Sequence, residues 1–473
     1  MNKKNSIFII CAGLLLLPLS SCFVAKDYHR PEVNTAGLYR TDRLQDSAFI
    51  VMDSTTMAEV SWKNLFSDTL LKQYIGTALD SNIDIRVALQ NIDAAAAYVR
   101  QGKAGYWPTL SAGLDYSDSK YSKNSLSGQS TNGKAISQYQ IGANLSWEAD
   151  IWGKIRSQKR AFDDSYLQTI EAHKAVKTQL VANIATTYYQ LMALDEQVKI
   201  AQLTIASRDS SLTTTKALKE AGQVTAVAVK QTEAQLYAAQ LILLELQQQQ
   251  RLLENSFCIL LNEPPHSIQR NTLKGQTINT ELKVGVPANL LANRPDVREA
   301  ELGLMQAFEM TNVAKSNFYP SLTITAAGGF QSVSLKDWLN VNSIFANVAG
   351  SLLQPIVNHR QIRTAYEVAK AQQQQALLRY EQTLLTAGNE VSNALYNYQT
   401  EAQAIVLEQK QFEAYQTAVN YSEQLLINGL ANYLEVLTAR QNALSTQLSL
   451  VNARYEQLAS IIELYRALGG GWK

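Results

Sequence analysis

Net charge, histidine and catalytic motifs are all scarce in this chain of 473 residues. The formal net charge is +1, which gives no electrostatic reason to expect a nucleic-acid partner. The four histidines are scattered, and no cysteines or histidines have the close spacing of metal ligands. The sequence lacks a glycine-rich phosphate loop and a Gly-x-Ser-x-Gly elbow, and Asp163-Asp164 is typical of a solvated helix face. We therefore expect no cofactor, no metal and no enzymatic activity.

The N-terminus combines a basic start, a short apolar run and a cysteine. Lys3 and Lys4 precede the apolar run, and Leu19-Ser20-Ser21 precedes Cys22. The run is too short to span a bilayer stably, and this order of residues resembles a bacterial lipoprotein signal peptide. We predict that residues 1–21 are removed and that Cys22 is lipidated, which would anchor the protein through several acyl chains. The alternative is an ordinary signal peptide with a chance cysteine.

Cysteine is also scarce, with three in the chain. Cys11 lies in the predicted signal peptide and Cys22 is the predicted lipidation site, so Cys258 alone remains and no disulfide within the mature chain is possible. Cys258 lies on an apolar stretch, which predicts a buried packing residue. After Cys22 no run of about 18 apolar residues follows, so we expect no transmembrane helix. Any membrane-spanning part would consist of strands.

Two long helical runs with a strict heptad spacing dominate the chain. An apolar period of about 3.5 residues over this length calls for partner helices and a left-handed twist. Each run makes a rod on the order of 100 Å long. We expect these helices over residues 155–220 and 361–428, ending at the turns of Gly222 and Gly429. The seam residues are Ile184, Leu191, Val198, Ile205 and Leu212 in the first run, and Leu384, Val391, Tyr398, Ile405, Phe412, Val419 and Leu426 in the second.

Four stretches change to an apolar period of two, which is typical of strands with one apolar face. They form two expected hairpins, at residues 109–149 and 321–353, with a polar loop over 118–138 in the first. The apolar positions are Leu110, Ala112, Leu114, Tyr116, Tyr139, Ile141, Ala143, Leu145, Trp147, Leu322, Ile324, Ala326, Gly328, Phe330, Ile344, Ala346, Val348, Gly350 and Leu352.

The order helix, hairpin, long helix and return helix occurs twice, which indicates an internal duplication. Asp68 is the expected N-cap of the first helix. The four shorter helices are expected over about 68–103, 226–261, 296–317 and 433–468. The expected segments are the signal peptide 1–21, a lipidated N-terminal arm 22–67, a first repeat 68–261, a connector 262–288 with a short strand near 281–286, a second repeat 289–468 and a tail 469–473.

The number of strands limits how the hairpins can be used. A sheet in lipid cannot leave its edges unpaired, and the smallest barrels have about eight strands. Either the hairpins are soluble, or several chains close one barrel, with two chains supplying eight strands and three supplying twelve. For the long helices the alternative is a two-helix coiled coil. The coiled coil fits less well, because the long helices carry few charged pairs. They are instead rich in Gln, Thr, Ser and Ala, and these side chains suit the wall of a water-filled tube.

Six short motifs are spread along the chain. They are Tyr28-His29-Arg30-Pro31, Asp150-Ile151-Trp152-Gly153-Lys154, Asn293-Arg294-Pro295-Asp296-Val297, Asn317-Phe318-Tyr319-Pro320-Ser321, Gln354-Pro355-Ile356 and Ala467-Leu468-Gly469-Gly470-Gly471-Trp472. Their order is similar to that of the outer-membrane efflux family, the TolC-like proteins, and specifically its lipoprotein branch serving resistance-nodulation-division pumps. The resemblance implies a mixed α and β membrane protein that is a homotrimer. Four strands per chain would complete a twelve-strand outer-membrane barrel, continued by a twelve-helix periplasmic α-barrel, with an equatorial belt from about 23–65, 262–288 and the C-terminus.

The resemblance also places a periplasmic gate at the start of the last helix, in the stretch that ends with Arg440 and Gln441. Leu434 matches the constricting apolar ring of the family. Thr438 stands where the family often has Asp, so an anionic ring is absent there, and Glu435 is a candidate to supply the charge instead. The alternative is that Leu434 only packs against other helices. The turns at Gly222 and Gly429 would form the mobile tips, and residues 222–227 an adaptor-facing groove.

The function that the resemblance implies is a passive exit duct of a tripartite efflux pump. Drugs or other small molecules would pass from an inner-membrane resistance-nodulation-division pump and a periplasmic adaptor to the exterior. The other expected partners are two further copies of this chain and outer-membrane lipid. The protein would be anchored in the bacterial outer membrane, with its helices in the periplasm. Two alternatives stay open, a lipid-anchored structural coiled coil and the outer duct of a protein-secretion system.

Overall fold

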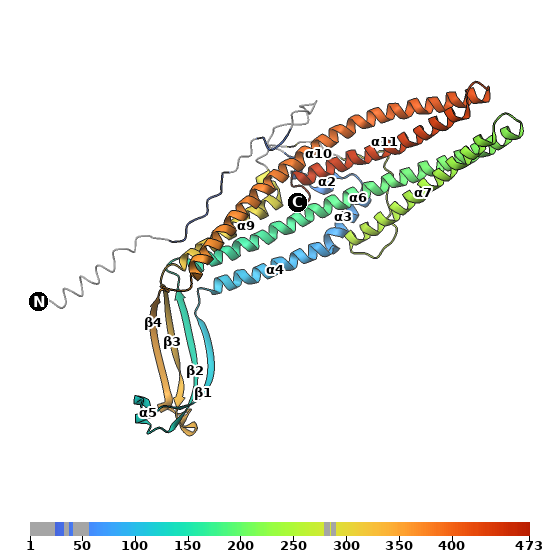
Figure 1. Cartoon of the computed structure of the whole chain (residues 1–473). Helices are drawn as coiled ribbons and strands as arrows, with labels where there is room; N and C mark the ends of the chain where they lie inside the picture. Colours follow the sequence, from blue (N-terminus) through green and yellow to red (C-terminus); the bar gives the residue numbers. More distant parts are fainter. Residues whose placement is uncertain (1–23, 33–36, 41–55, 279–283, 285–289) are drawn as a thin grey trace. The chain divides into compact units, whose positions relative to one another are not determined.

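A computed structural model describes residues 24–32, 37–40, 56–278, 284 and 290–473 (Figure 1). The predicted signal peptide, the predicted lipidation site Cys22 and most of the short strand expected near 281–286 lie outside the described residues. The chain forms two compact units. The first comprises residues 1–32, 92–168 and 301–379, and the second comprises 33–91, 169–300 and 380–473. Each unit draws on both halves of the sequence, and the division of the chain into two repeats stays a prediction.

The first unit contains one antiparallel sheet in the order β1-β2-β3-β4. Both expected hairpins are present, and β2 of the first pairs with β3 of the second. The polar loop of the first hairpin is shorter than expected and contains the short helix α5. The bounds are β1 Thr109–Lys120, α5 Leu126–Ser130, β2 Ala135–Ala149, β3 Ser321–Ser332 and β4 Ile344–Leu353.

The register places apolar residues of all four strands on one face of the sheet. Leu114 pairs with Ile141, Ile141 with Phe330, and Phe330 with Ile344. Because side chains alternate between faces along a strand, the residues between them lie on the other face. There most paired residues are polar or small, with Phe345 beside Gly329 as an exception, and one row runs Ser111, Asn144, Ala327 and Asn347. The predicted apolar face is therefore confirmed, and it is exposed, with Leu110 at 72% and Val348 at 78% of full exposure.

Asp150 and Gly153 build the junction at which β2 passes into α6, Lys154–Glu220. The carboxylate of Asp150 accepts hydrogen bonds from the backbone N–H groups of Ile155 and Arg156, both at 2.9 Å. A side chain in this position satisfies backbone donors that a helix start leaves without partners. Gly153 has a φ of +77°, which a residue with a side chain rarely adopts. The indole N–H of Trp152 donates to the carbonyl of Pro320 at 2.7 Å and so ties this junction to the start of β3.

The N-terminal arm, residues 24–30, runs along α9, Pro295–Ser316. The backbone N–H of Lys26 donates to Asn312 Oδ1 at 3.2 Å, and Asn312 Nδ2 donates back to the Lys26 carbonyl at 2.9 Å. One turn further along the helix, the Tyr28 ring meets the Phe308 ring edge-on at 5.6 Å. At the end of the arm, Arg30 forms an ion pair with the buried Glu301. The arm is thus fastened to the body of the first unit.

The two long helices have bounds close to those expected, and both contain 67 residues. Every seam residue is buried or half-buried, and Ile184, Leu191 and Val391 have no exposed surface. The heptad spacing therefore predicted both the helices and their buried face. None of the described helices is long and apolar enough to cross a membrane. The remaining bounds are α10 Gln361–Ile427, α7 Ala226–Leu261, α11 Tyr433–Ala467, α8 Leu290–Asn293, α2 Trp62–Leu65, α3 Thr69–Ser81 and α4 Ile83–Ala104.

The prediction of a single helix over 68–103 is wrong, because the helix is divided at Asn82 into α3 and α4. The Asn82 side chain accepts from the backbone N–H of Asp84 at 2.9 Å and so caps α4. Its amide donates to the carbonyl of Leu260 at 2.9 Å, near the end of α7. Asparagine side chains compete in this way with the backbone hydrogen bonds of a helix. The predicted N-cap at Asp68 is confirmed, since its carboxylate accepts from Leu70 N–H at 2.9 Å.

A buried arginine brings two of the sequence motifs together in the second unit. Arg294 is 3% exposed and forms ion pairs with Asp296 at 2.5 Å and Glu390 at 2.7 Å. It also donates to the carbonyl of Ala467 at 2.9 Å, at the end of α11. Gly469 follows with a φ of +91°, and a Cβ there would lie 2.5 Å from the Asn293 carbonyl. The C-terminal glycines therefore allow the tail to pack against the start of α9.

The expectation that Asp163 and Asp164 form a solvated helix face is wrong for Asp164, which is 8% exposed. Burial raises the pKa of the Asp164 carboxyl to about 6, and the negative charges of Glu309 and Asp163 raise it further, against the opposing effect of Arg160. All four residues belong to the first unit. At neutral pH such a carboxyl group is mostly ionised, and its negative charge lies in surroundings that disfavour it.

We predict that Asp164→Asn stabilises the protein at alkaline pH. Because the folded-state pKa lies above the ordinary value, folding gains stability at low pH and loses it as the pH rises through about 6. Asp164→Asn carries no charge at this site and so does not lose this stability. After allowance for solvent screening, the variant should be more stable than wild type by about 1–2 kcal/mol at pH 8. Melting temperatures of the detergent-solubilised protein between about pH 4 and pH 8 measure it. Asp163→Asn is the control, because Asp163 is half-buried and paired with Lys159. Equal pH profiles of Asp164→Asn and wild type would contradict the prediction.

Candidate functional site

Two helical turns at the end of the second unit have the same backbone construction. Gly222 ends α6 with a φ of +72°, and Gly429 ends α10 with a φ of +71°. In both turns, the backbone N–H of the glycine and that of the following residue donate to carbonyls in the last turn of the helix. This arrangement requires a residue with left-handed backbone angles. Thr225 then caps α7, and Asn432 caps α11 by accepting from Leu434 N–H at 2.7 Å. The predicted turns at Gly222 and Gly429 are thus present.

The predicted gate residues Leu434, Glu435 and Thr438 lie on the exposed side of the first turns of α11. Leu434 is 57% exposed, and the side chains of Glu435 and Thr438 are exposed as well. Leu434 and Thr438 are four residues apart and so share one face of the helix. The Thr438 hydroxyl donates to the Leu434 carbonyl at 2.9 Å, within the same helix. By contrast, Val436 is 2% exposed and supplies the packing of this turn.

Arg440, the fourth predicted gate residue, points toward neighbouring helices. Its guanidinium forms an ion pair with Glu423 of α10 at 2.6 Å. It also donates to the Ser211 hydroxyl of α6. One side chain of α11 therefore connects the helix pair α10–α11 to the pair α6–α7. The structure does not place Arg440 on the exposed face that carries Leu434.

Two further polar contacts join the same helix pairs, and sequence reasoning missed both. Arg208 of α6 donates to Gln441 Oε1 of α11 at 2.9 Å and to the backbone carbonyl of Gln235 in α7. The hydroxyls of Thr232 in α7 and Tyr433 in α11 are 2.6 Å apart. Together with Arg440, Glu423 and Ser211, these residues form what we call the tip network. It holds the first turns of α11 against α6 and α7.

The heptad pattern contains a signal for Arg208 that the sequence interpretation did not use. Ile205 and Leu212 are seam residues at one core position of the heptad, and Arg208 falls between them at the other core position. Ala201, one heptad earlier, is 1% exposed at the equivalent position, and Arg208 itself is 5% exposed. A charged residue at a core position is costly unless it is hydrogen-bonded. It therefore marks a polar interaction between helices.

A metal-binding cluster is absent from the described residues. No group of three or more His, Cys, Asp or Glu side chains in that part of the chain could hold a metal ion. Cys258 is buried, as expected, with its Sγ atom 3.4 Å from His266 Nδ1. The same Nδ1 atom lies 2.9 Å from the carbonyl oxygen of Pro264. Because a carbonyl oxygen only accepts hydrogen bonds, Nδ1 must carry the hydrogen that is donated. In that tautomer, His266 cannot take a proton from the thiol at Nδ1.

The fold agrees with the matches to known proteins. Residues 74–261 and 286–470 match the family model described as Outer membrane efflux protein. The chain belongs to this family. The solvent efflux pump outer membrane protein SrpC of Pseudomonas putida is 28% identical over 97% of both chains. The cation efflux system protein CusC of Escherichia coli K12 is 27% identical over 96% of this chain and 97% of its own length.

The solved structure of the outer-membrane channel OprN resembles the whole chain. It superposes with a TM-score of 0.86 at 25% identity, covering 95% of this chain and 100% of OprN. This outer membrane efflux protein therefore has the fold of the TolC-like outer-membrane channels. It is an efflux channel of the outer membrane, and its family consists of channels and not of enzymes. The alternative of a purely structural coiled coil does not agree with this membership.

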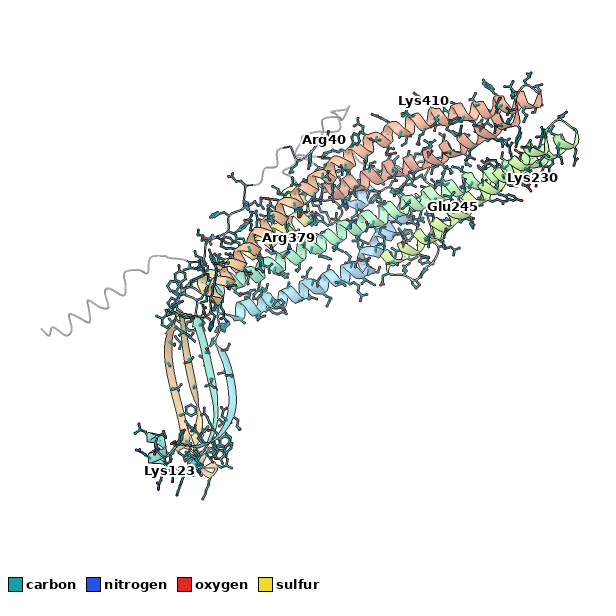
Figure 2. The ribbon with its side chains drawn as sticks, in the orientation of Figure 1. Arg40, Lys123, Lys230, Glu245, Arg379 and Lys410 are labelled. Atoms are coloured by element: carbon teal, nitrogen blue, oxygen red, sulfur yellow. The ribbon has the colours of Figure 1, made fainter. Side chains whose placement is uncertain are left out.

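We predict a measurable coupling between Arg440 and Glu423. Because both side chains are partly exposed, at 25% and 38%, the ion pair should contribute about 0.5–1 kcal/mol. A double-mutant cycle with Arg440→Ala and Glu423→Ala, read from thermal unfolding in detergent, measures it. The control cycle uses the ion pair of Lys230 with Glu233 on α7. The Lys230 side chain (Figure 2) is 79% exposed, so this pair should couple less. Additive effects of the first pair would mean that the contact does not stabilise the tip.

Proposed function

We propose that this protein is the outer duct of a tripartite efflux pump, closed at its periplasmic end by the tip network. The observation that carries the proposal is the sheet of the first unit, whose apolar face is continuous across four strands and exposed. An exposed apolar face beside a polar one suits a wall between lipid and water. The same chain continues into long amphipathic helices, which suit the wall of a tube through the periplasm.

Three copies are proposed because both the sheet and the helices leave surfaces for a neighbour. The outer strands β1 and β4 each pair with one strand only in the described chain. Lipid cannot satisfy the open edges, so the sheets of several copies would have to pair. The helix α7 carries an exposed apolar stripe and so does α10, which supports contacts between copies along the helices. The stripe residues are Tyr237, Leu241, Leu244, Leu252 and Ile259 on α7, and Leu378, Leu385, Tyr396 and Leu407 on α10.

The gate is proposed at Leu434, with Thr438 one turn further on the same face. Leu434 is a large apolar side chain that is more than half exposed at the start of α11. Three copies would place three such side chains at one level of the duct and so narrow it. The tip network would hold the closed position, because Arg440 and Arg208 join α11 to α6. Glu435 would add a negative charge beside this ring.

The proposed partners follow from the tips and from the family. The turn of residues 222–227 would contact a periplasmic adaptor, which would pull α7 and α11 apart and break the tip network. An inner-membrane resistance-nodulation-division pump would supply the energy. The names of the relatives SrpC and CusC refer to solvents and to cations, which supports a duct that accepts what its pump delivers.

A lipid anchor at Cys22 is proposed from the position of the arm. Val24 is 4% exposed, and its carbonyl accepts from Lys315 Nζ at 3.3 Å, close to the start of β3. Ala25 lies against Gly153, at the junction between β2 and α6. Cys22 stands two residues before Val24 in the sequence, and the described end of the arm lies beside the end of the sheet. An acyl chain there could enter the same membrane as the strands.

We predict that breaking the tip network and the apolar ring opens the duct. Wild-type protein in planar bilayers should conduct weakly, whereas Arg440→Ala with Leu434→Ser should conduct with a much larger open fraction. The open fraction changes tenfold for each 1.4 kcal/mol or so that the closed state loses. Lys410→Ala, at an exposed residue of α10 (Figure 2), is the control and should behave as wild type. A double variant that conducts no more than wild type would show that the gate lies elsewhere.

We predict that Cys22 is the lipidation site. Cells grown with labelled palmitate should incorporate label into the wild-type protein and not into Cys22→Ser, because the thioether and the N-acyl chain both depend on this cysteine. Cys258→Ser is the matched control and should retain the label, since Cys258 is buried. Label in the Cys22→Ser protein, or none in the wild type, would refute the proposed anchor. This experiment tests the anchor independently of conduction.

A further inference from the structure

The second unit contains a cavity beside the tip network, between α6, α10 and α11. Its volume is about 390 Å³, within the range of small-molecule sites. Of its lining residues, six are apolar, three are charged (Arg208, Arg440 and Glu423), and five are neutral and polar (Thr204, Ser207, Gln416, Asn420 and Gln447). We call it the tip cavity. The apolar lining consists of Ile200, Leu203, Phe412, Val419, Ala443 and Leu444.

The charges that line the tip cavity do not cancel. Glu423 is paired with Arg440, and the two together are neutral. Arg208 is 5% exposed, and its hydrogen-bond partners are a backbone carbonyl and the amide oxygen of Gln441. Neither partner carries a negative charge. One buried positive charge is therefore left without a counter-charge from the described residues, and a buried charge is costly unless it is paired.

The environment of Arg208 shows the same imbalance. Burial lowers the pKa of the Arg208 guanidinium, and the positive charge of Arg440 lowers it further. A guanidinium has five N–H donors, and the two hydrogen bonds of Arg208 leave donors free for another acceptor. An anion at this position would pair with the charge and accept these donors together. Such charge-assisted hydrogen bonds are the strong ones.

We propose that the tip cavity binds an organic anion, with its acidic group at Arg208 and its apolar body against the α6, α10 and α11 side chains. Carboxylates and sulfonates with a small aromatic or aliphatic body have the required chemistry. The acidic group pairs with the guanidinium, and the body covers apolar surface around Phe412 and Leu444. A ligand in this position contacts three helices at once. It therefore favours the arrangement in which the tip network is closed.

The binding of this anion can be measured without conduction, so the site and the proposed duct can fail separately. The probe is para-trifluoromethylbenzoate, followed by fluorine NMR on the full-length protein in lipid nanodiscs, with empty nanodiscs as the blank. The neutral para-trifluoromethylbenzamide has the same body without the charge. We expect the benzoate to bind at least about tenfold more tightly, which corresponds to one charge-assisted hydrogen bond.

Variants distinguish the cavity from unspecific binding of an anion. Arg208→Met should weaken benzoate binding about tenfold or more and leave benzamide binding unchanged. Glu423→Gln should strengthen benzoate binding at Arg208, because it removes the one negative charge from the lining of the cavity. Lys410→Met removes a positive charge from the exposed side of α10 and should have no effect. If Arg208→Met does not fold, the change in benzoate affinity caused by Glu423→Gln tests the proposal.

Three results would overturn the proposal. The first is equal affinity for the benzoate and the benzamide. The second is a folded Arg208→Met protein that binds the benzoate as tightly as wild type, or a Glu423→Gln protein that binds it more weakly or unchanged. The third is an equal loss of binding in Lys410→Met and Arg208→Met, which would indicate attraction by net charge alone.

Discussion

Burial of the apolar seam on α6 and α10 is the interaction on which the helical part of the structure depends. Helices of 67 residues bury little surface alone, and most helical stability in proteins comes from packing of an apolar face. The seam supplies that face at every seventh residue. In the part farthest from the tips it is closely packed, with Ile184, Leu191 and Leu384 at most 1% exposed. These contacts fix the register of α6 and α10 against the shorter helices, and the positions of both tip turns follow from that register.

Much of the fold could be predicted from the sequence because its signals are local and periodic. The heptad spacing gives the long helices, and the alternation of apolar and polar residues gives four strands and the face that each presents. Gly222 and Gly429 mark turns because a left-handed residue is needed there. Asp68 caps α3 for an equally local reason. The break at Asn82 was not predicted, because it depends on a hydrogen bond to Leu260, which is distant in the sequence.

The candidate site was predicted less completely, for a related physical reason. A resemblance to known channels identifies Leu434 and Thr438 by their position in α11, and the structure adds that both are exposed on one face of that helix. The partners of Arg440 come from α10 and α6, so no spacing along α11 indicates them. The two arginines differ in this respect. Arg208 interrupts an apolar pattern and could have been recognised, whereas Glu423 and Ser211 resemble any polar residue on a helix surface.

The contrast between the seam and the tip bears on where the proposed gate would open. Apolar packing loses a large area of contact when helices separate, so the closely packed part resists opening. Toward the tip, Ile205, Phe412 and Leu426 are only half-buried while Leu212 and Val419 stay buried, and polar contacts are added to the connection between helix pairs. The ion pair of Arg440 with Glu423 is partly exposed, so water competes for both groups and the net contribution of the pair is small. Elements that move belong to the least stable part of a protein. The partial replacement of apolar by polar contacts would therefore concentrate any opening at the tips and leave the wall of the tube intact.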